Sequence, residues 1–491
     1  MTQSLLRGTS PGLSFAEYVD HDALGLATLV RSGDTSADEL LDIALNRIDA
    51  VNPAINAVVD IFADKARAQI AQGLPEGPLA GVPFLLKDLF IDLTGVTTTS
   101  GAVFLKDTVA KRDSTVAERY KNAGLVIFGK THSCEFGGAP TTESQLYGIT
   151  RNPWNLDYSA GGSSGGSSAA IAAGILPAAN GSDAGGSIRS PAATCGLFGL
   201  KPTRGLAPLG PARFDGGGGI ATVHALTRSV RDSAALLDAV AGPELGASYA
   251  SPVQSRPLLD EVQRDPPRLR IAVMPQSPFG DQVAPDCLAA VVDAASLCAS
   301  LGHIVEEAAP AVDAELYLRT RQVLKGAAAT TGIHAAERGL GRKATDKDFE
   351  HATWEAYRYG LTVTGEDVMR AREAMFALHQ QVAQFMTTYD MILSPTTALG
   401  PFLVGTMGPE YTDDIAGTLR RRVSTFSALA NMTGQPAMSV PLFWNAANMP
   451  VGVQFWGRFA EEATLFQLAG QLERARPWFK RLPSMTLEAA R

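Results

Sequence analysis

The sequence is poor in cysteine and has no long apolar run. Its 491 residues include only four cysteines, Cys134, Cys195, Cys287 and Cys298, which are too few and too scattered for a disulfide framework. The longest apolar block, Ala169 to Ala179, is far shorter than the ~18 residues that a membrane span requires. The segment Met1 to Asp20 lacks the apolar stretch of a signal peptide. These absences predict a cytoplasmic protein with no membrane partner.

Positive charge is also in deficit. The chain has 42 Lys and Arg against 50 Asp and Glu, a formal net charge of −8, which argues against nucleic acid as a partner. Its 45% hydrophobic residues and 19% charged residues are typical of a folded chain with a sizeable core. Glycine, by contrast, is abundant at 48 residues, about a tenth of the chain against a usual ~7%.

Strand-like and helix-like segments alternate along the chain. Short apolar runs at 125–128, 270–273, 391–393 and 437–440 are typical of buried strands, and 451–456 is expected to pair with the strand before it. Helical patterns cover 227–240, 287–301 and 365–388, and Ser36 with Glu39 has the spacing of a capping box. This alternation predicts an α/β fold with a mixed, largely buried sheet. The strand-poor residues 310–390 are the best candidate for a helical insertion.

Two short motifs do not carry the chemistry that they suggest. Residues 124–131, GLVIFGKT, match the phosphate-loop pattern, but that loop needs a flexible turn where this segment has the strand itself. A strand that ends at Gly129 is the better interpretation. His132 and Cys134 have no neighbours with zinc-like spacing, so we interpret them as ordinary loop or core residues.

The most informative stretch is Gly161 to Ala192, in which two Gly/Ser clusters flank the apolar block. A solvated linker would not carry that block, so a helix between two tight backbone turns fits better. Asp183 and Arg189 flank the second turn and could form a buried ion pair. Ser187 follows Ala184-Gly185-Gly186, small residues whose N–H groups could converge on one oxygen, as a nucleophile beside an oxyanion hole requires.

A serine nucleophile needs a base. None of the seven histidines has a distinctive setting, and the alternative is a lysine kept neutral by burial. Lys87 directly follows the apolar residues 82–86. On these residues alone, a lysine that extends from a strand end toward solvent is the simpler interpretation.

Taken together, these motifs resemble the amidase signature enzymes, which are serine hydrolases with a Ser–cis-Ser–Lys triad. The resemblance covers nearly the whole chain and is carried by residues 81–88, 129–131 with 135–137, 152–155, 161–192, 199–205 and 434–437. It implies one large domain over residues 1–491, an α/β/α sandwich whose central mixed, twisted sheet is covered by helices on both faces. It also implies that no metal and no organic cofactor is needed.

The resemblance assigns roles to single residues. Ser187 is the expected nucleophile, Ser163 the bridging serine after a cis Gly162–Ser163 peptide, and Lys87 the base. The expected oxyanion hole consists of the N–H groups of Ala184, Gly185, Gly186 and Ser187. Ser164, Asp183 and Arg189 are expected to support this centre, and Gly137, Gly138 and Ala139 to border the substrate pocket.

The implied substrate is a small amide or carbamate, because the sequence is closest in style to aryl acylamidases, nylon-type cyclic oligoamide hydrolases and urethane-cleaving enzymes. A tRNA-dependent amidotransferase subunit, a non-catalytic scaffold and a homodimer remain open. An α/β-hydrolase esterase with Ser164 in the motif at 162–166 lacks the strand before that motif, and no histidine follows His379. The four glycines 216–219 suggest either a mobile loop over the site or a plain surface loop.

Overall fold

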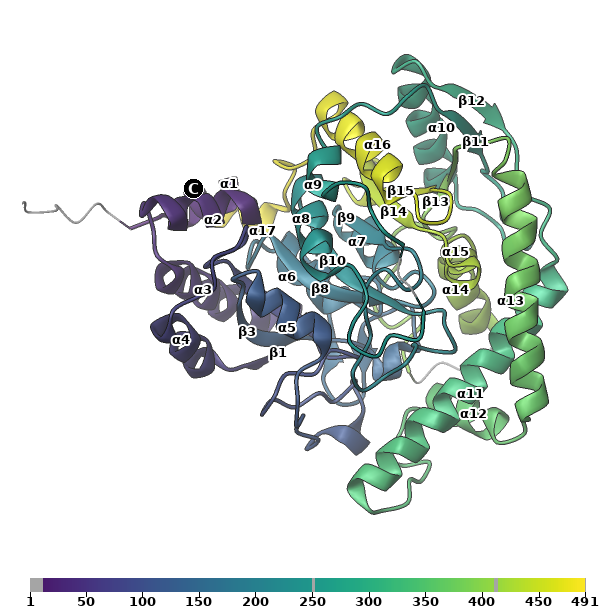
Figure 1. Cartoon of the computed structure of the whole chain (residues 1–491), viewed down its shortest axis with the longest axis horizontal. Helices are drawn as coiled ribbons and strands as arrows, with labels where there is room; N and C mark the ends of the chain where they lie inside the picture. Colours follow the sequence, from purple (N-terminus) through teal and green to yellow (C-terminus); the bar gives the residue numbers. More distant parts are fainter. Residues whose placement is uncertain (1–11, 250–251, 410–413, 491) are drawn as a thin grey trace, which may run out of the picture.

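A mixed sheet of eight strands forms the centre of the protein in a computed structural model that describes residues 12–249, 252–409 and 414–490 (Figure 1). In the order of the sheet, its strands are β12 (Ile304–Glu307), β11 (Arg270–Val273), β13 (Met391–Pro395), β15 (Pro450–Trp456), β14 (Ala437–Trp444), β9 (Phe198–Lys201), β10 (Thr222–Thr227) and β8 (Ala178–Asp183). β11 runs parallel to β12 and β13, whereas the pairs from β13 through β15, β14, β9 and β10 to β8 are antiparallel.

Helices cover both faces of this sheet, which confirms the predicted α/β architecture. In β9, the Phe198 ring packs at a tilt against Phe466 of α16, while on the opposite face an added Cβ at Gly199 would lie only 2.6 Å from the Cβ of Ala192 in α7. The two neighbouring residues thus face helices on opposite sides of the sheet, as strand alternation requires. The α-helices are α1 (Phe15–Asp20), α2 (Ala23–Ser32), α3 (Ala37–Ile55), α4 (Ala63–Gln72), α5 (Thr115–Asn122), α6 (Gly165–Ala172), α7 (Arg189–Cys195), α8 (Val230–Val240), α9 (Leu258–Glu261), α10 (Pro285–Ser300), α11 (Ala314–Leu340), α12 (His351–Gly360), α13 (Gly365–Phe385), α14 (Asp414–Ser424), α15 (Ser427–Thr433), α16 (Glu462–Ala475) and α17 (Ser484–Ala489).

A second, three-stranded sheet holds the strand that carries Lys87. Its order is β1 (Val58–Ile61), β3 (Val126–Thr131) and β2 (Pro83–Lys87). The predicted strand at 125–128 therefore lies outside the central sheet, and it does not end at Gly129 but continues to Thr131, because Lys87 of β2 pairs with Thr131. The smaller elements are β4 (Glu143–Ser144), β5 (Gly148–Ile149), β6 (Arg151–Asn152), β7 (Asn155–Ser159) and the 3₁₀ turns η1 (Val103–Leu105) and η2 (Glu135–Gly137).

Several predicted boundaries differ from the structure. The apolar block at 169–179 is not one helix: α6 already begins at Gly165 and ends at Ala172, and β8 begins at Ala178. Thr227 ends strand β10, and the following helix begins only after Ser229, whose side chain accepts a hydrogen bond from Asp232 N–H. The capping box at α3 is half formed, because Glu39 accepts from Leu13 N–H and Thr35 rather than from Ser36.

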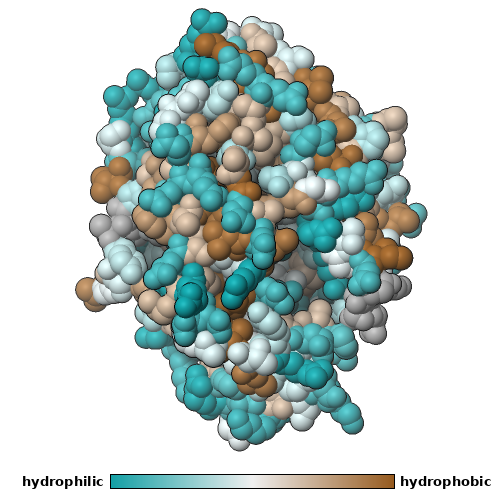
Figure 2. All heavy atoms as spheres, turned by 90° about the vertical axis from the view of Figure 1, so that its right-hand side faces the viewer, coloured by the Kyte–Doolittle hydropathy of each residue, from teal (hydrophilic) through white to brown (hydrophobic). Residues whose placement is uncertain are grey.

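The strand-poor region after β12 forms α11, α12 and α13, which lie along one side of the molecule (Figure 1). On the face that Figure 2 shows, polar side chains are interspersed with small apolar patches.

An aromatic cluster joins the segment before α12 to the body of the protein. The Phe349 ring packs against Trp354 of α12 and against Phe104 of η1 and Phe136 of η2. Within the described ranges, no helix combines the length and the apolar character that crossing a membrane would need.

Candidate active site

Lys87 is the last residue of β2, and its side chain is fully buried. The four residues before it, Pro83 to Leu86, are buried as well, so the strand carries the lysine into the interior rather than toward solvent. Its Nζ atom donates hydrogen bonds to Ser163 Oγ at 2.7 Å and to Ser182 Oγ at 2.9 Å. The interpretation of a lysine that reaches solvent is therefore wrong, because both partners of Lys87 are buried hydroxyl groups.

Burial makes Lys87 a base at neutral pH. Removal from water disfavours the charged ammonium and lowers the pKa of Lys87 to about 7, while the nearby Cys134 and Asp183 oppose this shift. A substantial fraction of the amine is then neutral near pH 7. A neutral amine retains protons for the bond to Ser182 and offers its lone pair to Ser163.

A cis peptide joins Gly162 and Ser163, as the family resemblance implied, and the Ser163 side chain meets Lys87. The backbone is tightly enclosed here, since an added Cβ at Gly162 would lie 2.4 Å from the carbonyl oxygen of Thr141. Gly137, at the end of η2, lies against the same serine: its added Cβ would be 3.1 Å from Ser163 Oγ. Of the three residues expected to border the pocket, Gly137 is thus placed directly at the centre. Gly138 is exposed, and Ala139 contacts the Cys134 thiol.

Ser187 lies in the turn between β8 and α7, and its carbonyl oxygen accepts a hydrogen bond from Ser164 N–H at 3.2 Å. Ala184, Gly185 and Ser187 are partly exposed, and among the described residues their N–H groups have no acceptor. Gly186 differs from the expectation because its N–H donates to Asp183 Oδ1 at 2.7 Å. The turn therefore leaves three N–H groups without an acceptor in the described chain, rather than the four expected for an oxyanion hole.

Asp183 and Arg189 form the predicted buried ion pair, with 2.8 Å between Asp183 Oδ1 and Arg189 Nη2 and no exposed side-chain surface on either residue. Burial alone would raise the pKa of the Asp183 carboxyl, but the Arg189 charge and hydrogen bonds from Arg189 and Asn431 outweigh it and lower that pKa. Asp183 also accepts hydrogen bonds from the N–H groups of Gly186 and Ile188. The pair consequently fixes the backbone on both sides of Ser187.

Replacing Asp183 by asparagine is expected to lower the free energy of unfolding by about 3–5 kcal/mol, because the buried Arg189 charge loses its partner. Urea unfolding followed by circular dichroism measures this change. The matched control is Asp157→Asn at an exposed position, for which we expect a change within about 0.5 kcal/mol. Equal stability of the two variants would contradict the structural role of the pair.

Several residues at the centre were missed by sequence reasoning. Ser182 lies inside the predicted signature, and its position before Asp183 on β8 was a usable signal. Asn431 and Gln454 bind Arg189 from distant parts of the chain, through Arg189 Nη2 and Nη1 at 2.6 Å each. No local pattern marks either of them, since only the fold brings α15 and β15 to this turn.

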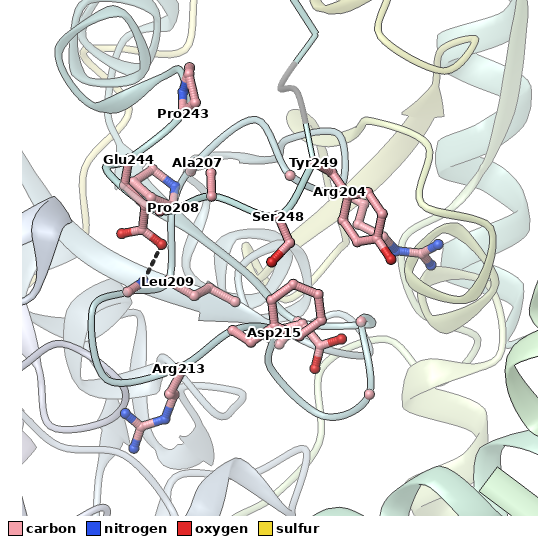
Figure 3. Close-up of a pocket in the computed structure, with 18 of the residues that line it drawn as sticks. Arg204, Ala207, Pro208, Leu209, Arg213, Asp215, Pro243, Glu244, Ser248 and Tyr249 are labelled. Carbon is pink, nitrogen blue, oxygen red and sulfur yellow. Dashed lines mark hydrogen bonds between the residues drawn. The ribbon is translucent and has the colours of Figure 1, made fainter. Parts of the chain in front are cut away.

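A cavity of about 720 Å³ lies outside this centre (Figure 3). It is lined by the loops at 204–221 and 242–249 together with α13, and it includes none of Lys87, Ser163 and Ser187. Gly218 and Gly219 of the glycine-rich loop line it, and an added Cβ at Gly218 would lie 2.8 Å from Leu324 of α11. The glycine-rich loop therefore separates this cavity from α11.

The residues considered as metal ligands have other partners. The His132 ring nitrogens bind the Thr150 and Ser144 hydroxyl groups at 2.7 and 2.8 Å. The Cys134 thiol contacts the backbone of Ala139. In the part of the chain that the structure describes, no three His, Cys, Asp or Glu side chains are grouped as metal ligands would be.

Comparisons with known proteins identify similar chains and folds. A family model described as Amidase matches residues 39–466. The chain is 38% identical over 477 residues to 6-aminohexanoate-cyclic-dimer hydrolase of Paenarthrobacter ureafaciens, covering 94% of this chain and 96% of that protein. It is 33% identical to an acylamidase of Rhodococcus erythropolis, covering 95% and 98% of the two chains.

Solved structures agree with these relatives. A 6-aminohexanoate cyclic dimer hydrolase superposes with a TM-score of 0.91 at 37% identity, covering 95% of this chain and 99% of the other. A bacterial aryl acylamidase of the amidase signature family superposes with a TM-score of 0.85 at 26% identity, covering 96% and 98%. The similarity extends over nearly the whole chain in both cases.

Proposed function

Because this chain belongs to the Amidase family, we propose that it is a serine amide hydrolase in which Ser187 is the nucleophile and Ser163 and Lys87 relay its proton. One observation carries this proposal. The buried amine of Lys87 is hydrogen-bonded to the Ser163 hydroxyl, beside a turn in which Ser187 and three N–H groups without acceptors in the described chain lie together.

In the first half of the reaction, Ser187 Oγ attacks the carbonyl carbon of the amide. Its proton passes to Ser163 as the Ser163 proton passes to neutral Lys87. The negative charge that develops on the carbonyl oxygen is stabilised by the N–H groups of Ala184, Gly185 and Ser187, each worth about 3–4 kcal/mol where such donors have been removed from other enzymes.

In the second half, the C–N bond breaks and the Lys87 proton returns through Ser163 to the departing amine. The product of this step is an ester between Ser187 and the acyl group. Water then attacks that ester while the same relay accepts its proton, and the carboxylic acid leaves as Ser187 regains its hydrogen. Every proton that leaves the serine thus returns, and the net reaction is amide plus water to acid plus amine.

We propose small aliphatic or aryl amides as the substrates. Two kinds of relative support this class, one named for a cyclic 6-aminohexanoate dimer and the other for acylamides. The same acyl transfer chemistry would cleave aryl carbamates, because their carbonyl group is attacked in the same way.

A hydrolysis panel tests the proposal. It contains anilides, aliphatic primary amides, a cyclic oligoamide, aryl carbamates and glutamine, and release of amine or acid is measured by chromatography with the wild type and with Ser187→Ala. We expect turnover of at least one anilide, oligoamide or carbamate by the wild type only. Turnover confined to glutamine would instead favour an amidotransferase subunit, and turnover that persists in Ser187→Ala would contradict the proposed nucleophile.

A further inference from the structure

Helix α11 brings an arginine to the turn that carries Ser187. An added Cβ at Gly185 would lie 4.0 Å from Arg321 Nη2, so the guanidinium group lies directly beside one of the proposed oxyanion donors. The same Nη2 atom donates a hydrogen bond to Ser424 Oγ at the end of α14, at 3.0 Å. Arg321 is thus held over the catalytic turn by an uncharged partner.

Lys325 lies one helical turn after Arg321, so both side chains are on the same face of α11. Its side chain lies near Cys134, which in turn lies near Lys87. Lys325 is exposed to solvent, and Arg321 and Arg420 are close enough for their charges to act on it.

The two cations have no carboxylate partner within the described ranges. No ion pair in those ranges includes Arg321 or Lys325. The Glu135 carboxyl near Cys134 does not supply the missing charge, because burial and Glu350 raise its pKa to about 8 and keep it mostly protonated at neutral pH. Like charges four residues apart on a helix repel each other. A bound anion would relieve that repulsion.

The helix that carries this pair is firmly packed. Val323 and Leu324 are buried in the main hydrophobic core, and Leu324 contacts the glycine-rich loop at Gly218. The helix backbone that carries Arg321 and Lys325 is therefore held in place beside the turn of Ser187. Arg420 adds positive charge nearby, but its guanidinium group already donates to the carbonyl oxygens of Met407 and Gly408.

We propose that Arg321 and Lys325 bind a carboxylate of the substrate, so that the preferred substrates are amides that carry a negatively charged group near the scissile bond. This proposal rests on the proposed function, because it places the carboxylate beside the turn that carries Ser187. It separates this enzyme from an amidase selective for neutral amides, since the two cations would favour a charged substrate.

Three matched anilides test this selectivity. Butyranilide is neutral, succinanilic acid carries a carboxylate on the acyl half, and 4-butyramidobenzoic acid carries it on the amine half. For the wild type we expect kcat/KM for one of the two acids to exceed that for butyranilide by about 10- to 100-fold, the effect of a charge-assisted hydrogen bond. In Lys325→Met and Arg321→Met that ratio should fall about tenfold or more, whereas Lys325→Arg should retain most of it.

Two further variants test the same ratio of kcat/KM values: one reverses the charge at Lys325, and the other removes a lysine far from the site. Lys325→Glu should make the acids worse substrates than butyranilide, while Lys347→Met, at an exposed lysine in the loop between α11 and α12, should leave the ratio unchanged. The proposal is overturned if neither acid is preferred by the wild type, or if Lys325→Met keeps the wild-type ratio. Circular dichroism of each variant excludes misfolding as the cause of a changed ratio.

A second measurement applies even if none of the three anilides is hydrolysed. A fluorophosphonate probe labels an activated serine, and glutarate should slow labelling of the wild type more than the neutral glutaramide does, with this difference lost in Lys325→Met. Labelling of Ser187 without selective protection by glutarate would overturn the carboxylate site alone. No labelling of the folded protein together with no amide hydrolysis would overturn the proposed function as well.

Discussion

Replacing Ser187 by alanine is expected to lower kcat for amide hydrolysis by about 10⁶-fold, the loss seen when the nucleophile of a serine hydrolase is removed. The reason is that no acyl-enzyme can form, while the three N–H groups of the turn remain in place. Amine release measured by chromatography over several hours gives the residual rate. The Ser187 side chain has no hydrogen-bond partner in the described part of the chain, so the fold should tolerate the change.

Ser164→Ala is the informative companion variant. Ser164 is buried, and its Oγ donates to Ser182 O at 3.3 Å, which makes it a support of the turn. We expect Ser164→Ala to reduce turnover without abolishing it. The opposite outcome, an inactive Ser164→Ala beside an active Ser187→Ala, would revive the esterase interpretation of the motif at 162–166.

The second large effect on turnover is expected when Lys87 is replaced by methionine. We expect a loss of about 10²- to 10⁴-fold in kcat, because the relay loses the base that accepts the Ser187 proton. The wild type should show a matching pH dependence. Since burial lowers the pKa of Lys87 to about 7, the neutral amine predominates above that pH. Thus kcat/KM should rise about tenfold per pH unit below 7 and level off above it.

A second buried lysine provides the control for this pH profile. Burial also lowers the pKa of Lys201 to about 7, but its Nζ donates to the carbonyl oxygen of Pro202 rather than to a serine. Lys201→Met should therefore keep the wild-type midpoint in kcat/KM even if it is less stable. A midpoint that disappears in Lys201→Met, or a wild-type rate independent of pH between 5 and 8, would contradict the role of Lys87. This pH window brackets the pKa of about 7 that burial gives Lys87.

The sequence signals that succeeded are local ones. The Gly/Ser signature predicted the turn at Ser187 and the Asp183–Arg189 pair, which lie within one short stretch. The cis Gly162–Ser163 peptide was implied by the family resemblance that this signature carries. Apolar runs located the strands β11, β13, β14 and β15. The helix boundaries around α6 were wrong because glycine and serine are weak helix formers, and tertiary packing on β8 overrides that preference.

What the sequence could not provide depends on contacts between distant segments. The assignment of β3 to a separate sheet is set by pairing with β1 and β2. Gly186 N–H donates a hydrogen bond to Asp183 because of the direction in which the backbone of the turn points, and the sequence does not reveal that direction. The approach of Arg321 to Gly185 joins residues more than a hundred positions apart, and no spacing rule predicts such a pair.

The most direct test of the account is to identify the residue that carries the acyl group. The wild type is mixed with an anilide, quenched with acid within milliseconds and digested, and the modified peptide is sequenced by mass spectrometry. We predict an ester on Ser187, absent from Ser187→Ala and formed far more slowly in Lys87→Met. An acyl group on Ser163, Ser164 or any other residue, or rapid turnover without an acylated peptide, would contradict the central claim.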